Sequence, residues 1–120
     1  MGALKDPNLV KIAIGEYGEA LYFSRNVIPY VRGVKEEEWI DRFQFYSHIG
    51  IYGYKSDVLS EIVKLPESVL EKAESLEQLR WLANGYKIRT GVSDLPTIGI
   101  DTPEDLKAAE RYLEDISGRI

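Results

Sequence analysis

Two arginines and one histidine stand where they could bind an anion. Arg25 and Arg32 flank a stiff loop that contains Pro29, and two guanidiniums held this way could converge on a carboxylate or a phosphate. Both could equally be solvated or paired with nearby acids. His48 opens an apolar run and could donate a hydrogen bond to a ligand oxygen, or it could be a satisfied structural imidazole. These residue types suit an acidic ligand.

An acid and an amide stand side by side further along the chain. Glu77 and Gln78, with Glu74 and Trp81, lie off the apolar stripe of a helix predicted over 68–84. A carboxylate accepts from sugar hydroxyls and an amide both donates and accepts, so the pair suits a carbohydrate. The alternative is an ordinary solvated flank of a helix.

The stretch GIDTPEDL, residues 99–106, holds one acid more than a helix start needs. Thr102 supplies the cap, and Pro103 presets the first helical φ. Asp101 precedes the cap, where the chain should leave a strand. Ligands bind at the carboxyl ends of strands in α/β sheets, and a carboxylate there suits Mg²⁺. The alternative is that Asp101 only extends the cap.

Several elements must position these residues. A hairpin is predicted from strands 9–14 and 19–23, followed by an irregular loop 24–33. Residues 34–46 could form a short helix or a mobile loop. The run HIGIYGY, residues 48–54, shows no helical period and predicts a buried strand.

The second half of the chain alternates helix and strand. Ser56 is expected to cap a helix that runs to about Lys64. The capping-box spacing of Ser68 and Glu71 begins the helix 68–84, and Gly85 should terminate it. Its apolar stripe comprises Val69, Ala73, Leu76, Leu79 and Ala83. An edge strand 86–92, a loop 93–98 and a last helix from 102 to about 117 follow. This order predicts an α/β fold with a mixed sheet.

Composition excludes several classes of function. A chain of 120 residues forms one domain at most, and a net charge of −5 argues against nucleic acid as a partner. Zinc thiolate sites and multi-histidine metal sites are excluded because there is no cysteine and only one histidine. No apolar run is long enough for a membrane span and no signal peptide is evident, so we expect a cytoplasmic protein.

Four motifs together resemble one enzyme family. ALYFSRNVIPYVR (20–32), HIGIYGY (48–54), SLEQLRWLANGYKI (75–88) and GIDTPEDL (99–106) are similar to the C-terminal half of the 3-deoxy-manno-octulosonate (Kdo) cytidylyltransferases. Those enzymes make CMP-Kdo for lipopolysaccharide. The resemblance implies a Rossmann-like nucleotidyltransferase fold, of the nucleotide-diphospho-sugar transferase type. Residues 1–120 would form its mixed-sheet C-terminal part as a single partial domain.

The resemblance also implies roles for individual residues. The sugar pocket would be formed by Arg25, Arg32, His48, Glu77 and Gln78. Asp101 would be a Mg²⁺ ligand that needs a second ligand from elsewhere, and Asp101 and Arg25 would be the catalytic residues.

The family's nucleotide-binding half has no counterpart in residues 1–120. Its Arg-, Ser- and Lys-rich loop and its Gln-Gly-Asp-Glu-Pro motif are not found. We therefore expect the chain alone to be inactive and to bind CTP only when the N-terminal half is present. As partners we expect either a second copy of the chain, in a homodimer, or a polypeptide that carries the N-terminal half. A subunit of a split nucleotidyltransferase and a non-catalytic sugar-binding or dimerisation module remain alternatives. Kdo cannot be told from a close analogue.

Overall fold

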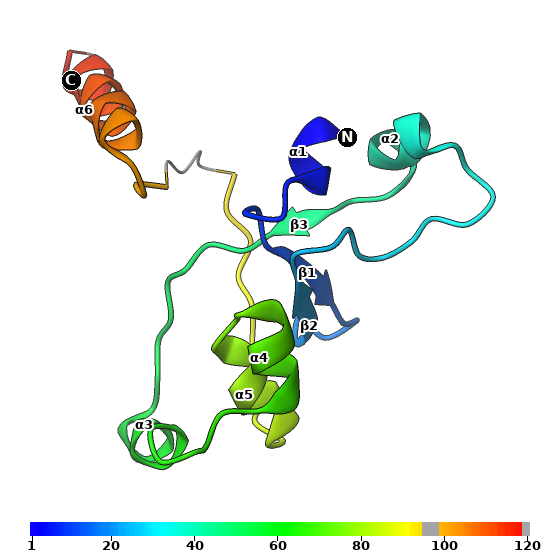
Figure 1. Ribbon diagram of the computed structural model, residues 1–120, viewed down its shortest axis with the longest axis vertical. Coiled ribbons are helices and arrows are strands. Elements are labelled where there is room, and N and C mark those ends of the chain that lie inside the picture. The colour runs from blue at the N-terminus through cyan, green and yellow to red at the C-terminus, as the bar shows by residue number, and fades with distance from the viewer. Residues whose placement is uncertain (95–98, 119–120) are drawn as a thin grey trace.

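The computed structural model describes residues 1–94 and 99–118 (Figure 1). The elements in chain order are α1 (Gly2–Lys5), β1 (Lys11–Ile14), β2 (Ala20–Ser24), the 3-10 turn η1 (Glu36–Glu38), α2 (Trp39–Arg42), β3 (Tyr46–Ser47), α3 (Ser56–Ile62), α4 (Val69–Glu74), α5 (Gln78–Ala83) and α6 (Pro103–Ser117). From Ser56 onward the described residues form helices and no strand, so the alternation of helix and strand predicted for the second half is not confirmed. Residues 34–46, for which two structures were open, form η1 and α2.

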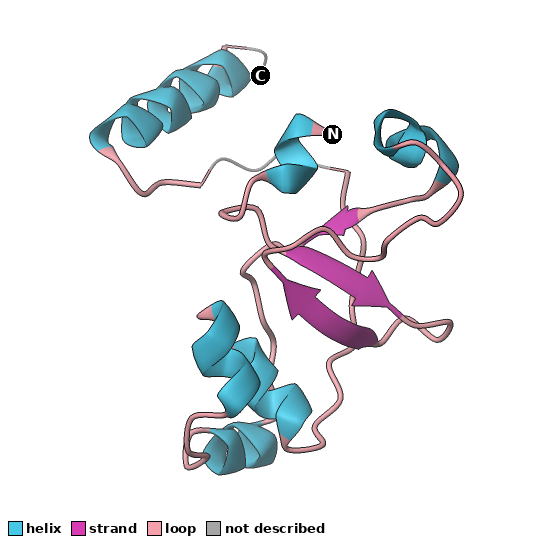
Figure 2. Cartoon of the chain, turned by 45° about the vertical axis from the view of Figure 1, so that its right-hand side comes forward, coloured by secondary structure: helices cyan, strands magenta, loops and turns pink. Residues whose placement is uncertain are grey.

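The predicted hairpin is confirmed and forms the centre of the sheet. β1 pairs antiparallel with β2, with Ile12 opposite Phe23, and the turn between them places Gly18 at a φ of 82°, which favours glycine. β3 pairs antiparallel with the other edge of β1, which gives the strand order β2-β1-β3 (Figure 2). Every strand pairing in the described residues is antiparallel.

The buried strand predicted over 48–54 is wrong. The strand in this region is Tyr46–Ser47, and its pairing ends with the His48 N–H donating to the Val10 carbonyl at 2.8 Å. Residues 48–55 then run as coil, and Ile51 is 84% exposed. An apolar run forms a strand only when a neighbouring strand accepts its backbone hydrogen bonds, and no described strand lies beside this one.

The edge strand predicted over 86–92 is reduced to a short pairing. Glu19 and Arg89 form an isolated antiparallel bridge. The Ala20 N–H donates to the Ile88 carbonyl and the Thr90 N–H to the Gly18 carbonyl, both at 2.8 Å. This pairing brings residues 88–90 against the start of β2, close to the core.

The helix predicted over 68–84 is two helices. The Ser68 and Glu71 capping box begins α4 as predicted, and Gly85 follows α5 with a φ of 85°. Between them Ser75 adopts a left-handed φ of 54°, which ends α4. The predicted apolar stripe is therefore broken: Leu79 is 0% exposed whereas Val69 is 84% exposed.

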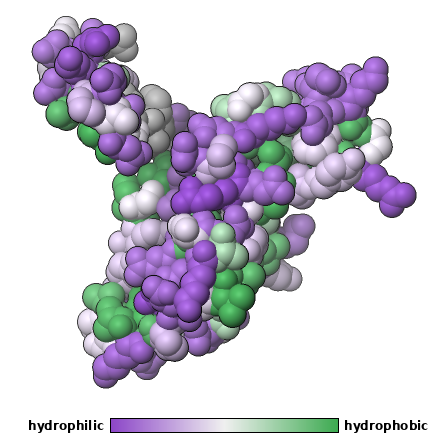
Figure 3. Space-filling model, in the orientation of Figure 1, coloured by the Kyte–Doolittle hydropathy of each residue, from purple (hydrophilic) through white to green (hydrophobic). Residues whose placement is uncertain are grey.

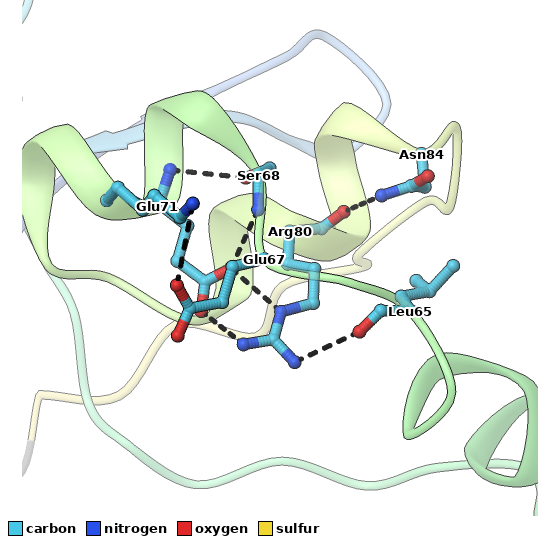
Figure 4. A network of polar contacts seen from close by, with 7 residues as sticks. Leu65, Glu67, Ser68, Glu71, Arg80 and Asn84 are labelled. Atoms are coloured by element: carbon cyan, nitrogen blue, oxygen red, sulfur yellow. Dashed lines mark hydrogen bonds and ion pairs between the residues drawn. The ribbon is translucent and has the colours of Figure 1, made fainter.

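An ion pair joins the two short helices across this break (Figure 4). The Arg80 guanidinium donates from Nε to Glu71 Oε2 at 2.7 Å and from Nη2 to Glu71 Oε1 at 2.5 Å. Its Nη1 also donates to the Leu65 carbonyl at 3.3 Å. A two-pronged pair of this kind fixes direction as well as distance, so it holds α5 at one angle to α4.

The core lies where α5 packs on the hairpin. Its buried residues are Ala20, Phe23, Leu76 and Leu79. Partly buried apolar side chains surround them, from Val10, Ile12, Tyr22, Leu82 and Ile88. Apolar side chains also reach the surface over α3, where Leu59 and Val63 are exposed (Figure 3). The core is small, and it joins the elements that carry the predicted site.

Helices α3 and α6 differ in how their N-termini are capped. Lys55, not Ser56, precedes α3, and no side chain caps that helix, so the predicted cap is wrong. In α6 the Thr102 hydroxyl accepts the Asp105 N–H, as the sequence predicted. Both views show α6 separated from the sheet, and none of its residues is buried (Figures 1 and 2). None of the described helices is both long and apolar enough to cross a membrane.

Candidate functional site

His48 lies in the wall of a hollow of about 520 Å³. The hollow is bounded by β1, by residues 44–52 and by residues 88–94. The backbone of His48 is fixed by the hydrogen bond to Val10, and its ring contacts the Phe23 ring edge-on, with centroids 5.4 Å apart. The predicted binding histidine is therefore half-buried and held by the core.

Tyr52 is the polar partner of His48. The Tyr52 hydroxyl and His48 Nε2 are hydrogen bonded. Burial lowers the pKa of His48 from its ordinary value of 6.5. Burial, together with the charges of Tyr54 and Glu77, raises the pKa of Tyr52 to about 12. Both side chains are thus neutral at neutral pH, and the site offers hydrogen bonds here rather than a charge.

An aromatic cluster joins this pair to α5. The Tyr52 ring meets the Trp81 ring edge-on at 5.2 Å, and Tyr54 meets Trp81 in the same way at 5.6 Å. Tyr52 and Tyr54 are stacked at 6.2 Å. These contacts explain why a coil segment without strand pairing still keeps Tyr52 in place.

Glu77 and Gln78 lie at the start of α5, beside this cluster. Glu77 is exposed, and its charge reaches Tyr52. Gln78 is 6% exposed, and among the described residues its Nε2 has no hydrogen-bond partner. Leaving a buried amide donor unpaired costs free energy, so this donor is available to a ligand that reaches it.

Arg25 is fixed at the end of β2 by backbone carbonyls. Its Nε donates to the Glu74 carbonyl at 2.6 Å, Nη1 to Pro7 at 3.0 Å and Nη2 to Ser75 at 3.2 Å. A guanidinium has five N–H donors. One N–H on each terminal nitrogen is therefore left without an acceptor among the described residues. Arg25 thus reaches the turn that immediately precedes Glu77 and Gln78.

Two charged side chains that bond to the backbone of Arg25, Glu74 and Lys11, were not predicted from the sequence. Glu74 accepts the Arg25 N–H at 3.0 Å. Burial pushes the pKa of Glu74 upward, but hydrogen bonds from Ser24, from the Arg25 backbone and from Tyr22 together hold it below its ordinary value. Lys11 is 0% exposed and donates to the carbonyls of Asp6, Leu9 and Arg25 over 2.5 to 2.9 Å. No local pattern in the strand KIAI distinguishes this lysine from a solvated one.

The family becomes clear from a comparison with protein-family models. The model described as Cytidylyltransferase matches residues 1–88, which is well over half of the chain. The chain belongs to the cytidylyltransferase family. The match covers the hairpin, the part of the hollow formed by β1 and residues 44–52, and both α4 and α5.

Two similar enzymes are both named 3-deoxy-manno-octulosonate cytidylyltransferase. The 3-deoxy-manno-octulosonate cytidylyltransferase of Parabacteroides distasonis is 55% identical over 111 residues, covering 92% of this chain and 44% of that protein. The enzyme so named in Porphyromonas gingivalis is 54% identical over 110 residues, covering 92% and 43%. The resemblance seen in the four motifs is confirmed. The chain spans a little under half the length of these relatives.

A solved cytidylyltransferase structure has the same fold. It is the structure of CMP:2-keto-3-deoxy-manno-octonic acid synthetase complexed with CTP, with 38% identity and a TM-score of 0.84. The match covers 95% of this chain and 45% of that one. The predicted α/β nucleotidyltransferase class is thereby confirmed.

The structure brings four of the six predicted site residues of this chain toward α5. His48 is bonded to Tyr52 in the aromatic cluster and the charge of Glu77 reaches Tyr52. Gln78 follows Glu77 at the start of α5, and Arg25 contacts the turn before α5. Arg32 is exposed and makes no hydrogen bond or ion pair with the described residues. The polar partner Tyr52 was missed, although it stands four residues after His48 in the motif HIGIYGY.

Asp101 does not make a metal site with the other described residues of the chain. Its backbone N–H donates to Asp105 Oδ2 at 3.1 Å, so the cap of α6 uses the amide of Asp101. Its carboxylate is exposed and has no partner in residues 1–94 and 99–118. Within the same residues no group of three or more His, Cys, Asp or Glu side chains could hold a metal ion. Within residues 1–94 and 99–118, Asp101 therefore stands apart from any complete metal site.

Proposed function

We propose that this chain is the C-terminal, sugar-binding part of an enzyme that activates Kdo with CTP to give CMP-Kdo and pyrophosphate. The observation that carries the proposal is the buried, unpaired amide of Gln78, next in the chain to Glu77, whose charge reaches Tyr52, the hydrogen-bond partner of His48. An unsatisfied buried donor is tolerated at a site whose ligand completes it. The names of the similar enzymes support Kdo as that ligand.

The chemistry of the site suits an acidic sugar. Arg25 keeps an N–H on each terminal nitrogen, which fits the two oxygens of a carboxylate, and Arg32 adds a second guanidinium. Glu77 accepts from sugar hydroxyls, and Gln78 and His48 donate to ligand oxygens. In the reaction, the anomeric hydroxyl of Kdo attacks the α-phosphate of CTP. Arg25 contributes by positioning and by neutralising charge.

The rest of the enzyme would come from a second stretch of polypeptide. The support is length, because the chain spans under half of the enzymes that it resembles. In this proposal, that stretch binds CTP and Mg²⁺, and Asp101 adds one oxygen ligand to the metal. The assembly works in the cytoplasm, in lipopolysaccharide synthesis, and is a homodimer or a pair of unlike polypeptides.

An interaction module without catalysis is the second candidate. It is favoured by α6, whose face shows Leu106 48%, Tyr112 36% and Leu113 62% exposed. An apolar helix face of this kind is normally covered by another surface. Association of the chain without any affinity for Kdo would support this second candidate over the first.

The first test is turnover. Pyrophosphate release is measured with CTP, Mg²⁺ and Kdo, for the chain alone and after addition of the N-terminal half of the Parabacteroides distasonis relative. We expect release only in the mixture, and less of it with Asp101→Asn. Robust release by the chain alone would contradict the proposal. So would an Asp101→Asn mixture that needs no more Mg²⁺ than the unaltered one.

The second test is direct binding of Kdo. Gln78→Met keeps the volume and length of the side chain but removes its donor. It should weaken Kdo binding about tenfold, as expected for one hydrogen bond, while the stability of the free protein stays the same or rises. Lys72→Met, at an exposed position of α4, is the control and should bind Kdo normally. Unchanged Kdo affinity in Gln78→Met would refute the role of this amide.

A further inference from the structure

We infer that Tyr52 is a positioning residue that fixes the tautomer of His48, so that Nδ1 carries the proton and donates to the ligand in the hollow. This inference rests on the proposed function, because it assigns the donor that His48 presents to an acidic sugar. It concerns a residue for which the four motifs gave no role.

The direction of the hydrogen bond follows from the partners of Tyr52. The hydroxyl proton of Tyr52 needs an acceptor because the side chain is half-buried. Among the described residues its only hydrogen-bond partner is His48 Nε2. If Nε2 carried a proton instead, the Tyr52 proton would be left unpaired. The bond is therefore satisfied when Tyr52 donates and Nε2 accepts.

The protonation states agree with this direction. Burial lowers the pKa of His48, which keeps one ring nitrogen free to accept. Burial also raises the pKa of Tyr52 to about 12, which keeps its proton in place. A neutral imidazole has one N–H, so an accepting Nε2 requires the proton to sit on Nδ1.

The aromatic cluster makes Tyr52 a rigid partner. Trp81 holds its ring edge-on, and Tyr54 stacks on it. His48 is held in turn by Phe23 and by its backbone bond to Val10. Both His48 and Tyr52 line the hollow, and Nδ1 has no hydrogen-bond partner among the described residues. The Nδ1–H is thus left to a ligand oxygen, and a carboxylate is the acceptor that gains most from it.

The single histidine of the chain makes the tautomer directly observable. A long-range ¹H–¹⁵N spectrum of the labelled 120-residue chain reports which ring nitrogen carries the proton. We expect Nδ1–H in the unaltered chain. Tyr52→Phe keeps the ring contacts with Trp81 and removes the hydroxyl, and it should shift the population toward Nε2–H. Tyr54→Phe is the matched control, since Tyr54 does not bond to His48, and it should leave the tautomer unchanged.

The outcomes are separable from those of the proposed function. Nε2–H in the unaltered chain overturns the inference, whether or not the variant folds, and so does a Tyr52→Phe spectrum identical to that of the control. In a Kdo titration, Tyr52→Phe should bind about tenfold more weakly than Tyr54→Phe. Equal affinities overturn the donor role. Absence of Kdo binding by the unaltered chain overturns the proposed function instead, because the tautomer is measured without sugar.

Discussion

Leu79→Ala and Val69→Ala should differ sharply in their effect on stability. A continuous helix over 68–84 would place both side chains on one inward stripe. The left-handed Ser75 breaks that helix, so Leu79 is 0% exposed in the core and Val69 is 84% exposed at the start of α4. The pair therefore tests whether the break exists.

The magnitude follows from what each side chain touches. Leu79 packs with Phe23, Leu76 and Ala20, and truncating a fully buried leucine costs about 2 to 5 kcal/mol. Several of the surrounding residues are only partly buried, so the site can partly collapse, and we expect about 3 kcal/mol. Val69→Ala removes an exposed side chain and should cost less than about 0.5 kcal/mol.

The assay is urea unfolding followed by far-ultraviolet circular dichroism. With a slope of about 1.5 kcal/mol per molar, a loss of about 3 kcal/mol lowers the midpoint by about 2 M. A loss of about 3 kcal/mol is a large part of the free energy of unfolding of such a domain, which is roughly 5 to 15 kcal/mol. The slopes must agree between the variants for the midpoints to be compared.

Equal costs for the two substitutions would refute the reasoning. That outcome would mean that α4 and α5 are one helix with a shared buried face.

Substitutions at three further positions test the contacts and the backbone geometry that hold the helices. Ser75→Gly should leave urea stability unchanged or raise it by up to about 1 kcal/mol, whereas Ser75→Val should lower it by about 1 to 2 kcal/mol, because φ is left-handed there. The hydrogen bonds from Arg80 hold the pKa of Glu71 below 4.5, so this carboxylate stabilises the fold above pH 4.5 and the contribution is lost as pH falls through the lowered pKa. Glu71→Gln should thus be less stable at neutral pH, and its urea midpoint should fall less steeply as the pH is lowered below 4.5. A midpoint that falls as steeply in Glu71→Gln as in the unaltered chain would contradict this. Thr102→Ala should speed amide exchange at Asp105 by removing about 1 kcal/mol of capping, and equal exchange in both proteins would count against that cap.

Elements set by local chemistry could be predicted from the sequence. The capping boxes at Ser68 and Thr102 involve residues three apart, and the left-handed Gly85 needs only its missing side chain. The hairpin turn at Gly18 is of the same kind. These features depend on the backbone groups next to them, so the sequence alone contains the information.

Elements that depend on distant partners could not be predicted. HIGIYGY has the composition of a buried strand, but a strand also needs a neighbour, which no pattern in the run supplies. The break at Ser75 carries neither glycine nor proline. It is held by Arg25, which lies 50 residues away in the sequence, and by the pair of Arg80 with Glu71, which spans the break. Long-range contacts of this type leave no periodic signal.

The candidate site shows the same division. The resemblance indicated Arg25, His48, Glu77 and Gln78, and the structure explains how His48 and Glu77 come together through Tyr52. The resemblance did not indicate that three backbone carbonyls anchor the guanidinium of Arg25, because those carbonyls come from separate segments. The roles of these side chains toward a sugar stay predictions until binding is measured.

The reactivity of the buried ammonium of Lys11 can report when β1 separates from its neighbours. Every other lysine in the described residues is exposed and open to acylation, whereas Lys11 is enclosed and its three N–H groups are all in use. An amine-reactive reagent can modify Lys11 only after β1 separates from the carbonyls around it. Mass spectrometry of the labelled peptide would therefore follow the loosening of this strand, at protein concentrations far too low for calorimetry.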